Sequence, residues 1–208
     1  MPGLWQQVRR LAGVSTPKPV IIVSGLPRSG TSLMMGMLAA GGVPVITDAQ
    51  RQADEDNPQG YYEFERVKRL KKGDIGWLAG AQGHAVKVIS ALLPHLPPGY
   101  SYRVLFMERP LAEVLASQRK MLARRRPDQV EAGEEDEIAA LLSRHLEETR
   151  RWLAAQPHIA TLYIPYHGLV ADPPRYIQQI GQFLALPLDR QAMAAAVEPT
   201  LYRNRLNR

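Results

Sequence analysis

Cysteine is absent from this chain of 208 residues. Its absence excludes disulfides, thiol nucleophiles and cysteine-built zinc or iron–sulfur sites, and it favours a reducing compartment. The five histidines are scattered without the HExxH spacing of zinc proteases, so we expect no metal site. No apolar run approaches the roughly 18 residues that a membrane helix needs, and the first residues lack a signal-peptide core. We therefore expect a soluble, cytoplasmic protein without a transmembrane segment.

Acidic residues are in the minority, with 20 Asp and Glu against 26 Lys and Arg, which gives a formal net charge of +6. The positive charges are spread along the chain. Their one dense run, RKMLARRRPD, contains no aromatic residues and is soon followed by the acidic EAGEEDE. Because single-stranded nucleic acids need aromatic side chains to stack on, we predict no nucleic-acid partner. The charge excess fits either a solvated basic surface or a small anionic ligand.

Short apolar runs are present where long ones are absent. Four of them consist of β-forming residues without polar alternation, which is typical of strands buried on both faces of a parallel sheet. They are VIIV (20–23), AVKVI (85–89), RVLFM (103–107) and TLYI (161–164).

Amphipathic helical patterns lie between and after these runs. They cover the segment after the first strand, with Leu33, Met34, Met37 and Leu38 on one side, and the segments 110–122, 136–153 and 173–186. Strands alternating with helices predict right-handed crossovers and an α/β fold, a three-layer α/β/α sandwich with a central parallel sheet. We expect a single domain over residues 1–208, with an N-terminal extension (1–18), a long loop (48–60) and a mobile loop (124–136).

A glycine loop follows the first strand in the sequence VIIVSGLPRSGTSLMM. Gly25 and Gly30 have the spacing of a nucleotide-triphosphate loop, G-x-x-x-x-G-K-[ST], but Thr31 stands where the lysine belongs. A loop of this kind, opening a helix, directs backbone N–H groups and the helix dipole at an anion. Arg28 is the cation inside the loop, and its guanidinium offers a fork of donors to anionic oxygens. We therefore predict a P-loop-like anion site without the usual lysine and magnesium.

The loop sequence GLPRSGTSLMM resembles the 5′-phosphosulfate loop of bacterial sulfotransferases that use 3′-phosphoadenosine 5′-phosphosulfate (PAPS). In that family a strand ends in an arginine, with a serine eight positions later, and both bind the 3′-phosphate. The segment RVLFMERPLAEVLAS has Arg109 and Ser117 at this spacing. The resemblance thus implies PAPS as donor, 3′,5′-diphosphoadenosine as product, and a donor-binding loop made of Pro27, Arg28, Ser29, Gly30, Thr31 and Ser32.

Further segments are similar to the same family. YHGLVADPPRYIQQI is similar to the segment whose tyrosine lies near the adenine, which implies that role for Tyr166. The stretch DNPQGYYEF, which contains Glu63, resembles the N-P-x-G-Y-x-E stretch of bacterial members. Lys87 in VKVIS stands at a strand end, where members of the family often keep a lysine near the sulfonate. A basic tail binds the 3′-phosphate in relatives. Here the tail LYRNRLNR offers Arg203 and Arg205 but lacks the usual R-K-G.

The resemblance implies in-line, metal-free transfer of a sulfonate group to an acceptor hydroxyl or amine. A sulfonate carries less charge than a phosphoryl group, so fixed cations and N–H dipoles can stabilise its transfer without magnesium. Arg28 and Lys87 would neutralise the developing charge. For the general base, Glu63 is the first candidate, Asp48 the second and His84 the third.

Two other functions fit parts of the sequence. A P-loop nucleotide kinase could use Glu108 to hold magnesium, although Thr31 argues against it. A non-catalytic nucleotide-binding module would explain the departure in the tail. The acceptor stays open among small molecules, carbohydrates, lipids and peptides, and the sequence does not indicate the oligomeric state.

Overall fold

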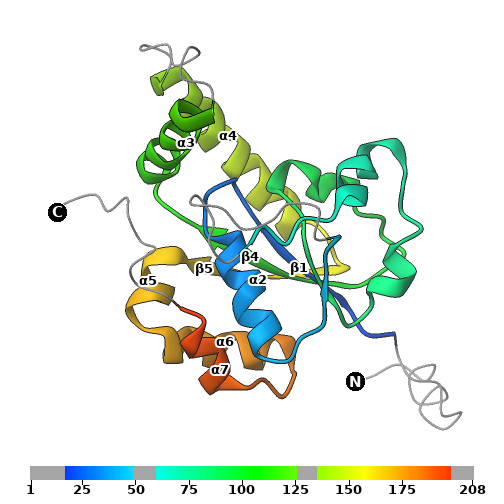
Figure 1. Cartoon of the computed structure of the whole chain (residues 1–208). Helices are drawn as coiled ribbons and strands as arrows, with labels where there is room; N and C mark the ends of the chain where they lie inside the picture. The colour runs from blue at the N-terminus through cyan, green and yellow to red at the C-terminus, as the bar shows by residue number, and fades with distance from the viewer. Residues whose placement is uncertain (1–16, 49–59, 126–134, 198–208) are drawn as a thin grey trace, which may run out of the picture.

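The computed structural model describes residues 17–48, 60–125 and 135–197. Its centre is a parallel sheet of five strands in the order β2-β3-β1-β4-β5 (Figure 1). The strands are β1 (Val20–Gly25), β2 (Val45–Ile46), β3 (Ala85–Lys87), β4 (Tyr102–Glu108) and β5 (Ile159–Pro165). The four predicted strands and the parallel sheet are confirmed. β2 was not predicted, because a strand of two half-buried residues leaves no pattern in the sequence.

The helices alternate with these strands. The α-helices are α2 (Thr31–Ala40), α3 (Leu111–Arg125), α4 (Glu135–Ala154), α5 (Tyr166–Ala171), α6 (Pro173–Leu184) and α7 (Arg190–Ala195). Three 3₁₀-helices, η1 (Glu65–Lys72), η2 (Leu78–Ala81) and η3 (Ser90–His95), fill the connections around β3. None of the helices within the described ranges combines the length and apolar character needed to cross a membrane.

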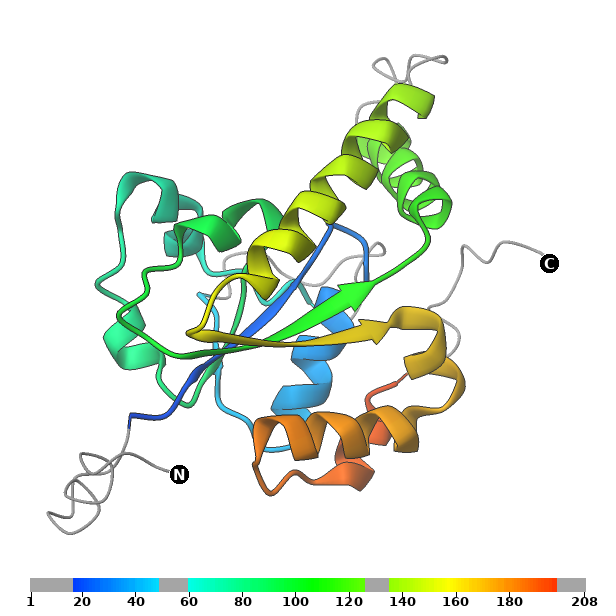
Figure 2. The same ribbon diagram turned by 180° about the vertical axis from the view of Figure 1, so that it is seen from behind.

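The two faces of the sheet bury different sets of side chains. Alternate residues of β1 point to opposite faces, as the period of a strand requires. Ile21 and Val23 belong to the core cluster that contains α2, α6 and α7, whereas Val20 and Ile22 belong to the cluster beneath η1, η2 and η3. Figures 1 and 2 show these helices on opposite sides of the sheet. The predicted three-layer α/β/α arrangement is therefore confirmed.

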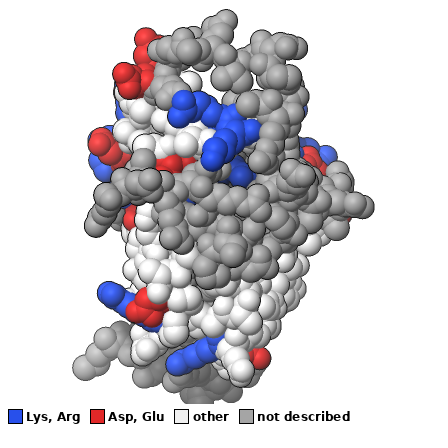
Figure 3. Space-filling model, turned by 60° about the vertical axis from the view of Figure 1, so that its left-hand side comes forward, with Lys and Arg blue, Asp and Glu red and all other residues white. Residues whose placement is uncertain are grey.

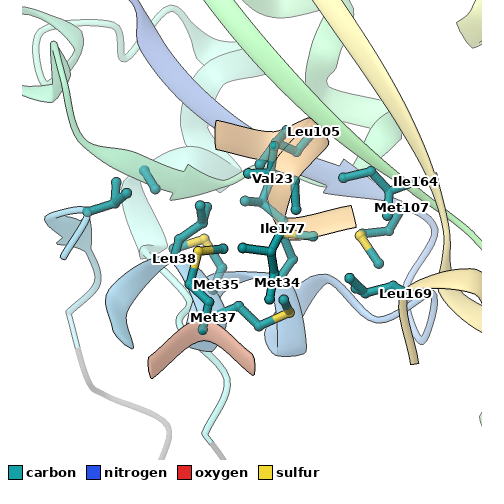
Figure 4. Packing of buried hydrophobic residues seen from close by; sticks show 14 of the residues in the cluster. Val23, Met34, Met35, Met37, Leu38, Leu105, Met107, Ile164, Leu169 and Ile177 are labelled. Carbon is teal, nitrogen blue, oxygen red and sulfur yellow. The ribbon is translucent and has the colours of Figure 1, made fainter. Parts of the chain in front are cut away.

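Helix α2 is fixed to the sheet by sulfur-containing side chains. Met34, Met35 and Met37 are fully buried, and they pack with Val23, Leu105, Ile164 and Ile177 (Figure 4). Flexible methionine side chains fill irregular gaps, so α2 can pack closely against several strands at once. This packing fixes the glycine loop, which is the connection between β1 and α2.

The predicted long connections are only partly described. Residues 124–125 belong to α3 and residues 135–136 to α4, so the predicted loop 124–136 is helical at both ends, and its centre, 126–134, lies outside the described residues. Most of the predicted loop 48–60 and of the predicted N-terminal extension also lies outside them. The helical ends of the predicted loop 124–136 were not recognised from the sequence. Its arginines and acidic residues are compatible with both exposed helices and loops.

Candidate functional site

The candidate site lies at the carboxyl edge of the sheet. β1 leads directly into the glycine loop, β4 ends just before Arg109, and β5 ends just before Tyr166. The register pairs Gly25 with Met107 and Glu108 with Pro165, so these strands end side by side. Lys87 pairs with Val23 from the other side of β1. Parallel α/β sheets bind ligands at this edge, next to the strand where the direction of the connections reverses, and here that strand is β1.

The glycine loop has a backbone that ordinary residues rarely adopt. Gly25 and Gly30 have positive φ angles of 146° and 101°. A β-carbon on Gly25 would lie 2.5 Å from the Ser29 Oγ, and one on Gly30 would lie 2.4 Å from Tyr166 Cδ2. Both glycines are thus required by the loop conformation and by close neighbours. α2 begins at this loop without a side-chain cap, so its first N–H groups have no cap acceptor and face the loop.

Ser29 carries a buried hydroxyl inside the loop. Its Oγ has no hydrogen-bond partner among the described residues. Buried polar groups are almost always satisfied, and an unsatisfied one costs about 1–3 kcal/mol. The hydroxyl points across the loop toward Gly25. An anion bound in the loop would give this donor an acceptor, so the residues present fit such a ligand.

Arg28 connects the loop to the helix after β4. It has a positive φ of 72°, which is uncommon for a residue with a side chain. Its Nε donates to Ser117 Oγ at 3.0 Å, and its carbonyl accepts from Arg109 at 3.2 Å. These two tertiary hydrogen bonds hold the strained residue in place. The structure therefore brings together Arg28, Arg109 and Ser117, the three side chains predicted to bind the donor's anionic groups.

Arg109 is fixed from several sides. Its Nε donates to Glu113 Oε2 at 3.0 Å, and its guanidinium lies 4.7 Å from the centre of the Tyr166 ring. The Arg109 and Glu113 side chains are only 8% and 1% exposed. His167 Nε2 lies 3.1 Å from the same Glu113 oxygen. A buried carboxylate thus contacts both a predicted phosphate-binding arginine and a partly exposed histidine.

Tyr166 lies beneath the glycine loop, against Gly30. It is buried, and burial raises the pKa of its hydroxyl, while the nearby Arg109 opposes the rise. The ring therefore remains neutral at physiological pH and packs under the cation. Its predicted place near an adenine stays a prediction.

Lys87 contacts the segment that carries the candidate bases. Its Nζ donates to the carbonyl of Tyr61, two residues before Glu63. Thr47 and Asp48 both donate to the Glu63 carbonyl, from the Thr47 hydroxyl at 3.0 Å and the Asp48 N–H at 3.1 Å. These contacts anchor the backbone of this segment to the end of β2.

The candidate bases differ in what their side chains contact. Asp48 accepts from the N–H of Glu65 at 2.7 Å, as an N-terminal cap of η1 would. The Glu63 carboxylate lies 3.8 Å from Lys68. His84 precedes β3, at the opposite edge of the sheet from the glycine loop. Asp48 and Glu63 both lie on the side of the sheet that carries the glycine loop, and which residue acts as general base stays a prediction.

The remaining predicted residues are distributed as follows. Pro27 is exposed, whereas Thr31 and Ser32 are half-buried in the first turn of α2. Arg203 and Arg205 lie outside the described residues. Glu108, the carboxylate considered for magnesium, forms an ion pair with Arg150 of α4. Basic side chains gather on the upper part of the face in Figure 3, at the level of α3 in Figure 1.

Three contacts of the site were missed at the sequence level. Glu113 stands four residues after Arg109, a spacing that favours an ion pair at a helix start and could have identified it. His167 and the Tyr61 carbonyl gave no such signal. Their roles depend on tertiary contacts with residues 54 and 26 positions away.

Several solved structures with a similar arrangement of elements are sulfotransferases. A sulfotransferase from Mycobacterium tuberculosis, STF1, aligns with 91% of this chain and 74% of its own, at 20% identity and a TM-score of 0.57. The sulfotransferase domain of the Synechococcus olefin synthase covers 90% and 86%, at 14% identity and 0.55. The fold is that of the sulfotransferases.

The sulfotransferase domain from the curacin biosynthetic pathway has the same fold, covering 92% of this chain and 93% of its own at 14% identity and a TM-score of 0.55. At the level of sequence, no known protein family matches the chain, and neither does any curated protein. The sulfotransferase fold is therefore recognised from backbone geometry, while the chemistry has to be argued from the side chains.

Proposed function

We propose that the protein transfers a sulfonate group from PAPS to a hydroxyl or amine of an acceptor, without a metal ion. The observation that carries this proposal is that Arg28 of the glycine loop contacts both Ser117 and Arg109. In this proposal residues 27–32, which form the glycine loop and the start of α2, hold the 5′-phosphosulfate. Arg109 and Ser117 hold the 3′-phosphate through charge-assisted hydrogen bonds. The sulfotransferase fold of the structural neighbours supports the same assignment.

The reaction would proceed by in-line displacement at sulfur. The acceptor oxygen or nitrogen forms a bond to sulfur, and the bond from sulfur to the 5′-phosphate oxygen breaks, leaving 3′,5′-diphosphoadenosine. Arg28 and Lys87 stabilise the negative charge on the bridging oxygen and the sulfonate. Glu63 takes the acceptor proton, and its segment is anchored by the bond between Lys87 and Tyr61. Arg28 donates to Ser117 in this structure, so one side chain links the two halves of the donor site.

Thermal unfolding with three nucleotides tests this proposal. Saturating 3′,5′-diphosphoadenosine should raise the unfolding midpoint by several degrees, because a ligand at about one hundred times its Kd adds roughly 2.7 kcal/mol. AMP and Mg-ATP at the same concentration should give smaller shifts. Arg28→Ala should reduce the shift with the diphosphate, whereas Arg144→Ala, which removes an exposed ion pair on α4, should not. A larger shift with Mg-ATP would support a kinase instead, and no shift with any nucleotide would contradict the proposal.

A further inference from the structure

The pair formed by Glu113 and His167 is not accounted for by the proposed chemistry. Glu113 is almost completely buried, and Arg109 and His167 contact the same carboxylate oxygen, Oε2. Arg109 approaches this oxygen from the end of β4, and His167 approaches it from α5. The His167 side chain is 43% exposed, so it is accessible to solvent while contacting a buried carboxylate.

Burying a carboxylate is costly unless cations and hydrogen bonds compensate for the lost hydration. Arg109 supplies a compensating charge and hydrogen bond to Glu113. The same contact fixes one edge of the Arg109 guanidinium. The Arg28 carbonyl fixes another nitrogen, and the Tyr166 ring supports the face. Glu113 is therefore one of the groups that set the orientation of the Arg109 guanidinium.

We infer that Glu113 is a positioning residue for Arg109 and that His167, when protonated, strengthens anion binding by sharing the charge of Glu113. This inference rests on the proposed function, since it assigns Arg109 to the 3′-phosphate. The charged and titratable groups that meet through these contacts are Arg28 of the loop, Arg109 after β4, Glu113 of α3, and Tyr166 beside His167 on α5.

The sign of the pH effect follows from the charges. With His167 neutral, one negative charge of Glu113 offsets one of the two arginine charges. With His167 protonated, the carboxylate is shared between two cations, and the net positive charge facing an anion rises by one. Anion affinity should therefore be higher when His167 carries its proton and lower at higher pH, where it does not. Tyr166 stays neutral there, because burial raises the pKa of its hydroxyl.

The experiment compares binding of 3′,5′-diphosphoadenosine and AMP to the full chain by calorimetry. In Glu113→Gln the selectivity for the diphosphate over AMP should fall about tenfold, the usual size of a lost charged hydrogen bond. Glu148→Gln, which removes the carboxylate of an exposed α4 ion pair, should leave selectivity unchanged. If Glu113 only weakened anion binding by its charge, its neutralisation would raise affinity for the diphosphate, and that result would overturn the inference.

The role of His167 is tested with His167→Gln at about pH 6 and about pH 8. The loss of diphosphate affinity relative to the unmodified chain should be several-fold larger at the lower pH. Titration of the ligand's own phosphates cancels in this comparison. His95→Gln, at an exposed position of η3, is the control. An equal loss at both pH values would overturn the pH coupling.

The failure of this inference can be distinguished from failure of the proposed function. If the unmodified chain itself does not prefer the diphosphate to AMP, both are contradicted. If it does prefer the diphosphate and Glu113→Gln keeps that preference, only the positioning role is contradicted. A thermal melt of each variant without ligand shows whether it is folded, and Glu113→Asp, which keeps the charge, should restore part of the selectivity if Glu113→Gln unfolds.

Discussion

At the scale of the residue, the site depends on close approaches that a single added atom would disturb. Gly30, Tyr166 and Arg109 are stacked, with the loop above the ring and the guanidinium against it. Arg109 and Tyr166 follow paired strands in register, so the ends of β4 and β5 bring them together. A loop motif and two spaced residues predicted this site, but the stacking could not be predicted, because it depends on the register of strands that are far apart in sequence.

Gly30→Ala should destabilise the fold and weaken anion binding. The new methyl group would overlap the Tyr166 ring, and alanine is strained at a φ of 101°. Together these effects should lower the free energy of unfolding by at least about 2 kcal/mol. Chemical denaturation measures the loss. Gly80→Ala, where nothing lies within 4 Å, is the control. Equal stability of the two variants would contradict the described contact.

The candidate bases show what the sequence can and cannot predict at this scale. Glu63 and Asp48 were both plausible from their positions after the first helix. In the structure the Asp48 carboxylate accepts a hydrogen bond from the N–H of Glu65, which favours a structural role for Asp48. Such a cap cannot be predicted from the sequence, because residues 48 and 65 meet only once β2 has paired with β3.

At the scale of the element, α2 fixes the position of the glycine loop, because its buried apolar side chains hold it against the sheet. Its apolar residues predicted a helix, and the structure confirms the helix. Met34, Met37 and Leu38 of the predicted stripe are buried, but Met35 beside them is buried as well, so the helix is apolar over most of its surface and not clearly amphipathic. The helices α5 and α7 were not predicted, since six residues each are too few to show a periodic pattern.

Met34→Ala should therefore lower both stability and ligand affinity. Met34 is fully buried between α2 and the sheet. Removing a buried methionine side chain leaves a cavity and costs about 2–5 kcal/mol. Urea unfolding should show this loss, whereas Leu141→Ala, at a leucine 67% exposed on α4, should change stability by less than about 1 kcal/mol. Comparable losses in both variants would contradict the assigned core.

β4 contains a tyrosine that should make the fold sensitive to alkaline pH. Burial raises the pKa of Tyr102, and its hydroxyl donates to the Pro97 carbonyl at 3.0 Å. A raised pKa in the folded state means that stability is complete below the unfolded tyrosine pKa of about 10 and is lost as pH rises above it. Tyr102→Phe should reduce this alkaline loss. Melting midpoints measured from about pH 8 to about pH 11 test it, and identical slopes for both proteins would contradict it.

At the scale of the whole molecule, the alternation of strands and helices was sufficient to predict the three-layer architecture. Continuous apolar runs indicated strands covered on both faces, and the structure shows a separate core on each face. The parallel order of the strands then places the ends of β1, β3, β4 and β5 along one edge, so residues 28, 87, 109 and 166 share one side of the sheet. The acceptor could not be predicted, because its specificity depends on loops without a sequence motif.

The measurement that tests the central claim most directly is calorimetric binding of 3′,5′-diphosphoadenosine and AMP in the presence of a metal chelator. We predict that the chain binds the diphosphate at least about tenfold more tightly than AMP, since one charged phosphate contact is worth roughly 1.5–3 kcal/mol. Arg109→Ala should remove most of that preference, because Arg109 is the buried cation assigned to the 3′-phosphate. Equal affinities for the two nucleotides, or binding of the diphosphate only when magnesium is supplied, would contradict metal-free recognition of a 3′-phosphorylated donor.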